Sequence, residues 1–246
     1  MRRFSLLFIL ITLLSTSLRA QQYTGMEGLL HVPSGEMDSA GVARIGAHFI
    51  CKDMLADRMK IDGEKYNTAT NYLSITPFSW IEIGYAYTLW KFHKNMNKKR
   101  QVGFYSKDRY FSLRIQPLKE GKYWPSVVLG GNDVWGQKDG GESGSNFYRN
   151  FYIATTKHFD YNGWNIGTTL SYRKWKQDYF KKWDGVVGGV TVNPPFYKPL
   201  RVIAEWDGNE VNMGADCTLF KYFLLQASLL NMQHFCGGLC FRINLL

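Results

Sequence analysis

One stretch of the chain decides the fold: residues 164–175 read WNIGTTLSYRKW. Its even-numbered residues are mostly apolar, namely Trp164, Ile166, Thr168, Leu170 and Tyr172. Its odd-numbered residues are small, polar or charged, namely Asn165, Gly167, Thr169, Ser171 and Arg173. Successive side chains of a β-strand point to opposite faces, so this pattern predicts a strand with one apolar and one polar face.

The same alternation recurs from Gly41 to the end of the chain. It marks about twelve segments, near the length of about 9–11 residues that a tilted transmembrane strand needs. The segments are 41–52, 66–76, 80–92, 108–118, 124–134, 147–158, 164–175, 184–193, 200–207, 209–219, 221–231 and 235–245. We therefore predict an all-β fold, a transmembrane antiparallel up-and-down β-barrel of about twelve strands over residues 41–246. The connections near Gly208 and Gln233 are tight, so about ten or about fourteen strands remain alternatives.

Charged residues inside these segments favour a membrane barrel over a soluble β-sandwich. Six of these residues are Glu82, Arg114, Arg173, Glu205, Asp216 and Arg242. An isolated charge is very costly in a dry core, whereas polar side chains normally face the lumen of a membrane barrel. We predict that the six form a salt-bridged network that lines or plugs the lumen. Paired carboxylates of a glycosidase are the alternative role for the acidic members and Asp207.

Aromatic residues and connection lengths support the same fold. Aromatic residues near segment ends suit two interfacial girdles: Trp80, Trp90, Tyr123, Trp124, Tyr161, Trp164, Trp175 and Trp206. Short connections alternate with long polar ones, which we place at 53–65, 92–107, 136–146 and 176–183. Such barrels have short periplasmic turns and long outer loops, so an even strand count places both ends of the barrel in the periplasm.

The first forty residues precede the barrel. Arg2 and Arg3, then the apolar run 4–14 and the small residues of 15–20, have the layout of a secretory signal peptide cleaved after Ala20. That run is too short for a transmembrane helix, although an N-terminal anchor is the alternative. Residues 21–40 contain a turn at Pro33 and Gly35 and are expected to lie at the periplasmic mouth or to plug the barrel.

The chain is basic, with a formal charge of +10 that falls to +7 once Arg2, Arg3 and Arg19 are removed. A basic surface suits outer-membrane lipid, lipopolysaccharide or an acidic polysaccharide, and export argues against nucleic acid. Two predicted outer loops combine cations with aromatic rings, as an anionic glycan site would. Their candidate residues are Lys98, Lys99, Arg100, Lys174, Trp175, Lys181, Lys182 and Trp183. Ordinary solvated loops are the alternative.

Motifs for chemistry are missing. The sequence has no phosphate-binding glycine loop, zinc-binding His-Glu-x-x-His or Gly-x-Ser-x-Gly, so we predict no catalytic residues, cofactor or metal. Of the four cysteines, Cys236 and Cys240 would lie roughly 13 Å apart on one strand, too far to pair. We interpret the cysteines as small buried hydrophobic residues.

Several motifs resemble the YjbH-like family of outer-membrane proteins. They are Gly28-Leu29-Leu30-x-Val32-Pro33, the run from Asp108 to Arg114 with LKEGKYWP at 118–125, VLGGNDV at 128–134, YIATTK at 152–157 and VIAEWDG at 202–208. The resemblance implies a β-barrel, a role in exopolysaccharide production or secretion, and export-machinery proteins as partners. It implies no catalytic residues.

These observations lead to one functional prediction and several alternatives. We predict a non-enzymatic accessory of exopolysaccharide production or secretion in the outer membrane of a Gram-negative bacterium. The first alternative is a general small porin or a surface adhesin that binds anionic glycan. The others are a soluble secreted β-sandwich lectin and a barrel enzyme that acts on lipid or glycan.

Overall fold

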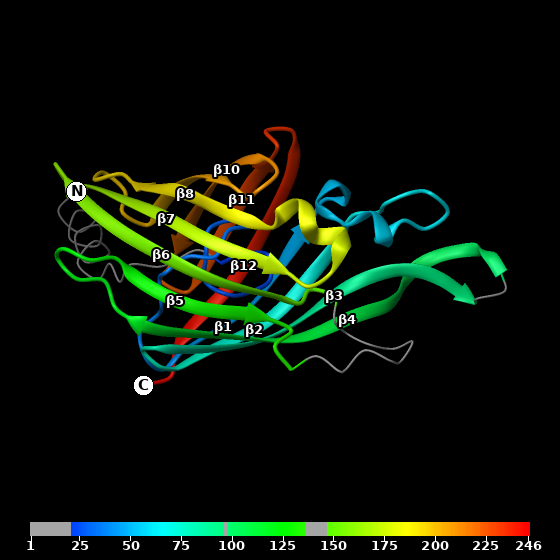
Figure 1. The fold of residues 1–246 in the computed structure, drawn as a ribbon, viewed down its shortest axis with the longest axis horizontal. Coiled ribbons are helices and arrows are strands. Elements are labelled where there is room, and N and C mark those ends of the chain that lie inside the picture. The colour runs from blue at the N-terminus through cyan, green and yellow to red at the C-terminus, as the bar shows by residue number, and fades with distance from the viewer. Residues whose placement is uncertain (1–20, 96–97, 136–146) are drawn as a thin grey trace, which may run out of the picture.

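The computed structural model describes residues 21–95, 98–135 and 147–246, with the backbone alone at Asn95 and at residues 98–100. Within these residues twelve antiparallel strands form a closed barrel (Figure 1). They are β1 Val42–Ile50, β2 Thr68–Phe78, β3 Ile81–Asn95, β4 Lys98–Leu118, β5 Ser126–Asn132, β6 Asn150–Tyr161, β7 Trp164–Trp175, β8 Gly185–Asn193, β9 Leu200–Trp206, β10 Val211–Leu219, β11 Phe223–Leu230 and β12 His234–Asn244. The predicted fold class is confirmed, and each strand overlaps one predicted segment.

In the described connections lie three short 3-10 helices: η1 Lys52–Met54, η2 Asp57–Met59 and η3 Asp178–Trp183. None of the helices in the described residues is long and apolar enough to cross a membrane.

Strands that are consecutive in sequence are neighbours in the barrel, and β1 pairs with β12 to close it. That closing pair runs in register from Val42 opposite Asn244 to Phe49 opposite Gly237. The two ends of the barrel sequence meet beside it, where the Leu245 N–H donates to the Gly41 carbonyl at 2.8 Å. The chain therefore enters and leaves the barrel at one end, as the even strand count predicts.

Tight turns fix the hairpins. Phe220 and Lys221 join β10 to β11 with φ of 52° and 66°, and Asn231 and Met232 join β11 to β12 with φ of 47° and 58°. Two consecutive residues with positive φ match the twist of paired strands. The tight connections near Gly208 and Gln233 are both hairpins, because Trp206 is opposite Val211 across the first and Leu230 is opposite His234 across the second. The count of twelve strands therefore holds.

The two faces of each strand differ as the alternation predicts. Outward residues such as Ile45 and Leu170 are 59% and 60% exposed, whereas the inward Arg44 and Arg114 are 2% and 0% exposed. Outward apolar side chains form the surface that lipid contacts in a membrane barrel. The buried core therefore lies in the lumen rather than between two layers.

Most of the predicted girdle residues lie on the outer surface. Trp80, Tyr123, Trp124, Tyr161, Trp164 and Trp206 are exposed at strand ends. Trp175 departs from this prediction because it is 2% exposed and packs inside the barrel. Trp90 is half-buried and packs edge-on against Phe147 with ring centroids 4.1 Å apart. Both belong to the interior packing at the outer end.

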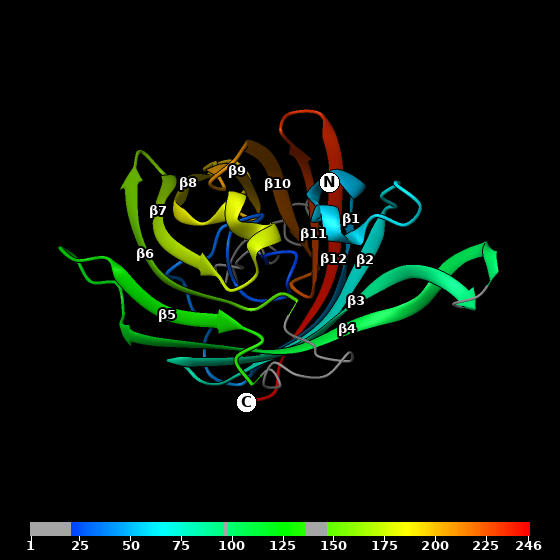
Figure 2. The same cartoon turned by 45° about the vertical axis from the view of Figure 1, so that its right-hand side comes forward.

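The β3–β4 hairpin corrects one predicted loop. Residues 92–107 were expected to connect two strands, but β3 continues to Asn95 and β4 begins at Lys98. Pairing persists along this arm, with Phe92 opposite Gly103 and His93 opposite Val102. Figure 2 shows the arm projecting beyond the wall of the barrel. Backbone hydrogen bonds between two strands also form outside a membrane, so a hairpin can extend beyond the strand length that a bilayer requires.

Candidate functional site

Residues 21–40, called here the inner segment, lie inside the barrel. Every residue from Gln21 to Asp38 is buried. The segment folds on itself through isolated bridges between Gln21 and Glu27 and between Gly28 and Pro33. The blue trace of Figure 2 follows it within the ring of strands. The interior of the barrel is therefore filled by the chain that precedes its first strand.

Glycine permits this close fit. Gly35 lies against β5 and β6, where a Cβ atom would come within 2.7 Å of the Thr156 nitrogen and 3.0 Å of the Ser126 carbonyl oxygen. Its own N–H donates to the Thr156 hydroxyl at 2.8 Å. Backbone atoms cannot move aside as a flexible side chain can, so a larger residue here would displace the inner segment.

Glu205 of β9 binds the backbone of the inner segment. Its carboxylate accepts the N–H groups of Leu30 at 3.0 Å, His31 at 2.8 Å and Val32 at 3.2 Å. Asn212 of β10 donates to the same carboxylate at 3.1 Å. Three successive backbone donors on one carboxylate form an anion-binding nest, which satisfies a carboxylate buried away from water.

Beside this nest, Arg173 and Asp207 hold His31. Arg173 donates to the His31 carbonyl at 2.7 Å and to the Asp207 carbonyl at 3.1 Å. The His31 Nδ1 lies 3.1 Å from the Asp207 Oδ2. Burial, reinforced by the positive charge of Arg173, lowers the pKa of His31 to about 4. His31 is therefore neutral near pH 7 and donates a hydrogen bond to a charged Asp207.

Burial alone would raise the pKa of Asp207, but its hydrogen bonds have the opposite effect. The ring of His31 and the N–H groups of Asn209 and Glu210 hold that pKa well below its usual range. The two N–H groups donate to the Asp207 Oδ1 at 2.9 Å each. Asp207 is thus ionised at the outer end of β9, close above the nest.

Arg114 of β4 joins the barrel wall to the inner segment. It donates to the Ser34 carbonyl at 2.7 Å and to the Glu36 carbonyl at 2.8 Å. Both carbonyls are bound by Nη2, whereas Nη1 forms an ion pair of 2.6 Å with Glu82 of β3 and lies 3.6 Å from the Glu27 carboxylate. The guanidinium is fully buried, and these contacts give both Nη atoms the partners that they would otherwise find in water, whereas Nε has no hydrogen-bond partner among the described residues.

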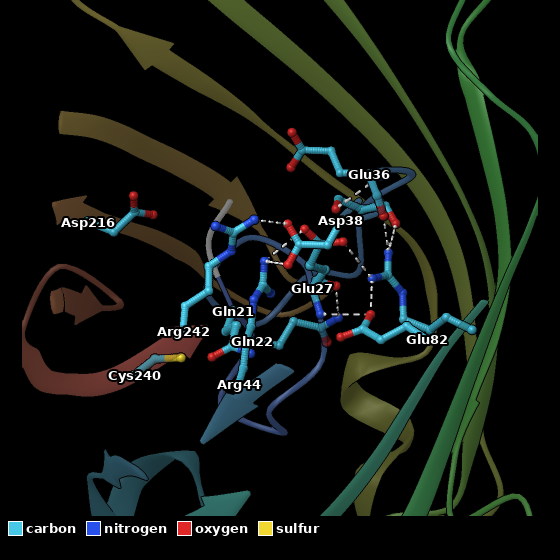
Figure 3. Close-up of polar contacts among 12 residues, drawn as sticks. Gln21, Gln22, Glu27, Glu36, Asp38, Arg44, Glu82, Asp216, Cys240 and Arg242 are labelled. Carbon is cyan, nitrogen blue, oxygen red and sulfur yellow. Dashed lines mark hydrogen bonds and ion pairs between the residues drawn. The ribbon is translucent and has the colours of Figure 1, made fainter. Parts of the chain in front are cut away.

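The acidic side chains of the inner segment pair with lumen arginines. Arg44 contacts Glu27 at 3.1 Å and also Asp38, and Arg242 contacts Asp38 at 3.2 Å. Arg201 bridges Asp216 at 3.0 Å and Glu36 at 3.3 Å. Figure 3 shows Glu27, Asp38, Arg44 and Arg242 pointing toward one another within the lumen. Charges on the wall and on the inner segment therefore compensate each other.

An aromatic cluster covers the outer end of the inner segment. Its buried members include Tyr23, Phe147, Tyr148, Trp175, Phe180 and Trp183. Helix η3 supplies two of them, and the Trp183 ring meets the His31 ring at a centroid distance of 5.4 Å. The lumen is thus filled by polar contacts along its length and by aromatic rings at its outer mouth.

All six residues of the predicted charge network point into the lumen: Glu82, Arg114, Arg173, Glu205, Asp216 and Arg242. They do not all contact one another, because each meets a different part of the inner segment or a neighbouring wall residue. Sequence reasoning missed Arg201 and the acidic side chains of the inner segment. Strand parity could have found Arg201, but an irregular segment has no periodicity from which to place its acids.

The predicted glycan-binding loops are only partly available to a ligand. The side chains of Lys98, Lys99 and Arg100 lie outside the described residues. Lys174 and Lys181 are exposed and pair with Asp184 and Asp178, and Lys182 lies 4.1 Å from the centroid of the Trp183 ring. Contrary to expectation, Trp175 and Trp183 are 2% and 3% exposed. Their rings belong to the aromatic cluster and offer no free face to a sugar.

Another basic and aromatic surface lies at the outer end, beside η2 and the base of the β3–β4 arm. A pocket of about 70 Å³, called here the outer groove, is lined there by residues that include Arg58, Tyr66, Lys91 and Phe92. The Lys91 Nζ lies 4.5 Å from the centroid of the Tyr66 ring. Within the described part of the chain neither Arg58 nor Lys91 forms an ion pair. No periodic pattern in residues 53–65 signals this outer groove in the sequence.

A family model described as "Exopolysaccharide biosynthesis protein YbjH" matches residues 20–174, more than half of the chain. No curated protein sequence matches significantly.

Among solved structures, outer membrane phospholipase A from Escherichia coli is 10% identical, covers 86% of this chain and 98% of its own, and has a TM-score of 0.38. The Salmonella typhi outer membrane phospholipase dimer with bound calcium is 10% identical, covers 83% and 91%, and also has a TM-score of 0.38. The outer membrane protease OmpT from Escherichia coli is 9% identical, covers 82% and 90%, and has a TM-score of 0.23.

Proposed function

Since the chain belongs to the YjbH family of exopolysaccharide biosynthesis proteins, we propose that it is a non-enzymatic accessory of exopolysaccharide production or secretion. It acts from the outer membrane of a Gram-negative bacterium. The observation that carries this proposal is the filled lumen, in which Glu205 and Arg114 bind the backbone of the inner segment. A barrel packed with its own chain suits an accessory role better than free diffusion of solutes.

Deletion of the gene tests this role. We expect surface exopolysaccharide to fall and to return when the wild-type chain is supplied in trans. The measurement is cell-surface polysaccharide, with membrane integrity checked by detergent sensitivity so that general envelope damage is recognised. Unchanged polysaccharide in a strain that normally produces it would contradict the proposal.

The exposed apolar face suits outer-membrane lipid, and basic residues outside the barrel suit lipopolysaccharide phosphate. Further export-machinery proteins are the proposed protein partners. The chain should fractionate with the outer membrane and change its gel mobility on heating, as folded barrels do. A chain found in the soluble periplasmic fraction would instead favour the secreted lectin.

Two assays separate the accessory role from a porin and from an enzyme. In planar bilayers the wild-type chain should show little steady conductance, whereas a variant that lacks residues 22–38 should conduct if it still folds. Large steady conductance of the wild type would favour a general porin. Release of fatty acid or sugar by the purified chain would favour a barrel enzyme.

A surface adhesin for anionic glycan is the second candidate, and the outer groove favours it. Arg58 and Lys91 carry charges without carboxylate partners among the described residues, and Tyr66 and Phe92 supply rings beside them. The double change Arg58→Gln and Lys91→Gln should weaken binding of an acidic polysaccharide. Lys94→Gln removes an exposed charge from the same arm outside the groove and is the control.

The basic loops stay within this second candidate. Lys98, Lys99, Arg100, Lys174, Lys181 and Lys182 would then add long-range attraction for a polyanion. Neutralising Lys181 and Lys182 together should reduce binding most at low salt, since exposed charges are screened. If polysaccharide binding is unchanged after both lysines are neutralised, these loops are not part of the binding site.

A further inference from the structure

Two cysteines that lie 185 residues apart in sequence meet at the outer end of the barrel. Cys51 follows the last residue of β1, and Cys236 lies near the start of β12. The Cys51 N–H donates to the Cys236 Sγ at 3.1 Å. Both side chains are 6% exposed and share one buried cluster with Leu230, against which Met54 packs.

The backbone register brings the two residues to the same end of the seam. Phe49 is opposite Gly237 in the β1–β12 pair, so continuing the register places Ile50 opposite Cys236 and Cys51 one residue beyond. Cys51 lies past the end of β1, outside the alternation of the strand, and the contact of its N–H with the Cys236 Sγ places its backbone next to that sulfur. The other two cysteines differ, because Cys217 lies in β10 and Cys240 lies four residues further along β12.

The β1–β12 pair is also the seam of the barrel. Every other neighbouring pair of strands is consecutive in the chain and is joined by a connection, whereas β1 and β12 are the first and last strands. Gly41 and Leu245 tie the inner end of the seam by a hydrogen bond of 2.8 Å. Cys51 and Cys236 occupy its opposite end, so a covalent bond between them would close the ring of strands.

We propose that Cys51 and Cys236 form a disulfide that closes the seam of the barrel in the exported protein. The reactant is a protein disulfide of the thiol–disulfide oxidoreductase class. One thiolate attacks the donor disulfide, forms a mixed disulfide and releases the first donor thiolate. The second thiolate attacks the mixed disulfide and releases the other. The chain loses two protons and two electrons, and the donor becomes a dithiol.

Exchange takes place before the barrel closes, while both sulfurs are accessible. In the folded chain the bond would be shielded, because both residues are buried and a reductant must reach one sulfur to attack it. The proposal rests on the proposed outer-membrane location, since export passes the chain through a compartment where disulfides persist. It does not depend on any role in exopolysaccharide production.

Thiol counting tests the bond directly. Cells that produce the full chain are quenched in acid, denatured and alkylated without reductant, then reduced and alkylated with a second reagent. Of the four cysteines, only Cys217 and Cys240 should take the first label. Mass spectrometry should find a peptide pair that links Cys51 to Cys236 and disappears on reduction. First label on both Cys51 and Cys236 in outer-membrane material would overturn the proposal, as would a link to a different cysteine.

Gel mobility gives an independent readout. A heated, unreduced chain that is closed between residues 51 and 236 should migrate faster than the reduced chain. Cys51→Ala should abolish the fast form, whereas Cys240→Ala, a buried change in β12, the strand of Cys236, should retain it. If Cys51→Ala fails to fold, the heat-denatured wild type still decides, because reductant reaches the sulfurs once the chain is unfolded. Equal mobilities of the denatured wild type with and without reductant would refute the disulfide.

These outcomes separate two failures. If the disulfide is missing in a chain that fractionates with the outer membrane, the disulfide proposal is refuted and the proposed function is not. If the disulfide is present but deletion of the gene leaves exopolysaccharide unchanged, the proposed function is refuted and the disulfide proposal is not.

Discussion

Replacing Glu205 by Gln should loosen the inner segment without unfolding the barrel. In the wild type one carboxylate oxygen accepts the N–H groups of Leu30 and Val32, and the other accepts the N–H of His31. Gln keeps the shape of the side chain but presents one oxygen and one NH₂ group. Whichever way the amide turns, at least one of the three backbone donors faces another donor.

The size of the effect follows from these contacts. A hydrogen bond to a charged group contributes about 1.5–3 kcal/mol, and a buried donor left without a partner costs about 1–3 kcal/mol. One contact is lost and the others become neutral, so we expect the docked inner segment to lose about 3 kcal/mol. Because about 1.4 kcal/mol is a factor of ten, opening of this region should become roughly 100-fold more frequent.

Hydrogen exchange in detergent micelles measures this opening. The amides of Leu30, His31 and Val32 should exchange roughly 100-fold faster in Glu205→Gln, while amides in β6 and β7 should stay protected. Glu210→Gln removes the same charge from the partly exposed turn after β9 and is the matched control. If the three amides exchange at the wild-type rate in Glu205→Gln, the carboxylate does not anchor the inner segment and the reasoning fails.

Three further changes probe other contacts of the inner segment. Arg114→Gln strands the buried carboxylate of Glu82 and should cost about 3–5 kcal/mol, read as a lower melting temperature, whereas Arg109→Gln on the exposed face of the same strand should change it little. Gly35→Ala should disturb docking by more than 1 kcal/mol, roughly the scale of overpacking, and an unchanged exchange pattern near residue 35 would contradict the close fit. Acidification should lower the free energy of unfolding, because burial lowers the pKa of His31 from 6.5 to about 4. The docked state therefore favours neutral His31, and its contribution, complete above pH 6.5, is lost as pH falls toward 4. In His31→Gln the melting temperature should therefore change less with pH across that range.

Much of the barrel could be predicted because the two faces of each strand meet different surroundings, so apolar and polar residues alternate along the sequence. In β7, each inward residue from Asn165 to Arg173 is small, polar or charged, and most of the outward ones are large and apolar. One face must meet lipid and the other the lumen, so the period of two survives in the sequence. The length of β3 and β4 was not predicted, because a hairpin that leaves the membrane no longer needs an apolar face.

The contacts of the inner segment could not be predicted in the same way. Glu205 was placed in the lumen by its parity, but its partners are three backbone N–H groups that carry no residue signature. Trp175 shows the opposite difficulty. An aromatic residue at a strand end suits an interfacial girdle, yet the odd parity that it shares with Arg173 turns it inward, against Phe180. Strand parity therefore carries more information than proximity to a strand end.

The contacts of Arg114 show that the inner segment is part of the fold rather than a loosely held ligand. Its guanidinium binds Glu82 on the wall and two carbonyls of the inner segment, and it is fully buried. Withdrawing the segment would take away both carbonyls and the Glu27 carboxylate, which lies 3.6 Å from Arg114, and leave a cation facing the lumen. Burial without partners is costly, so water or another acceptor must enter as the segment leaves. Opening the lumen therefore requires water or another acceptor to take the place of the inner segment beside each such arginine. Single changes at Arg114 or Glu205 are for this reason the most direct way to measure how firmly the inner segment closes the lumen.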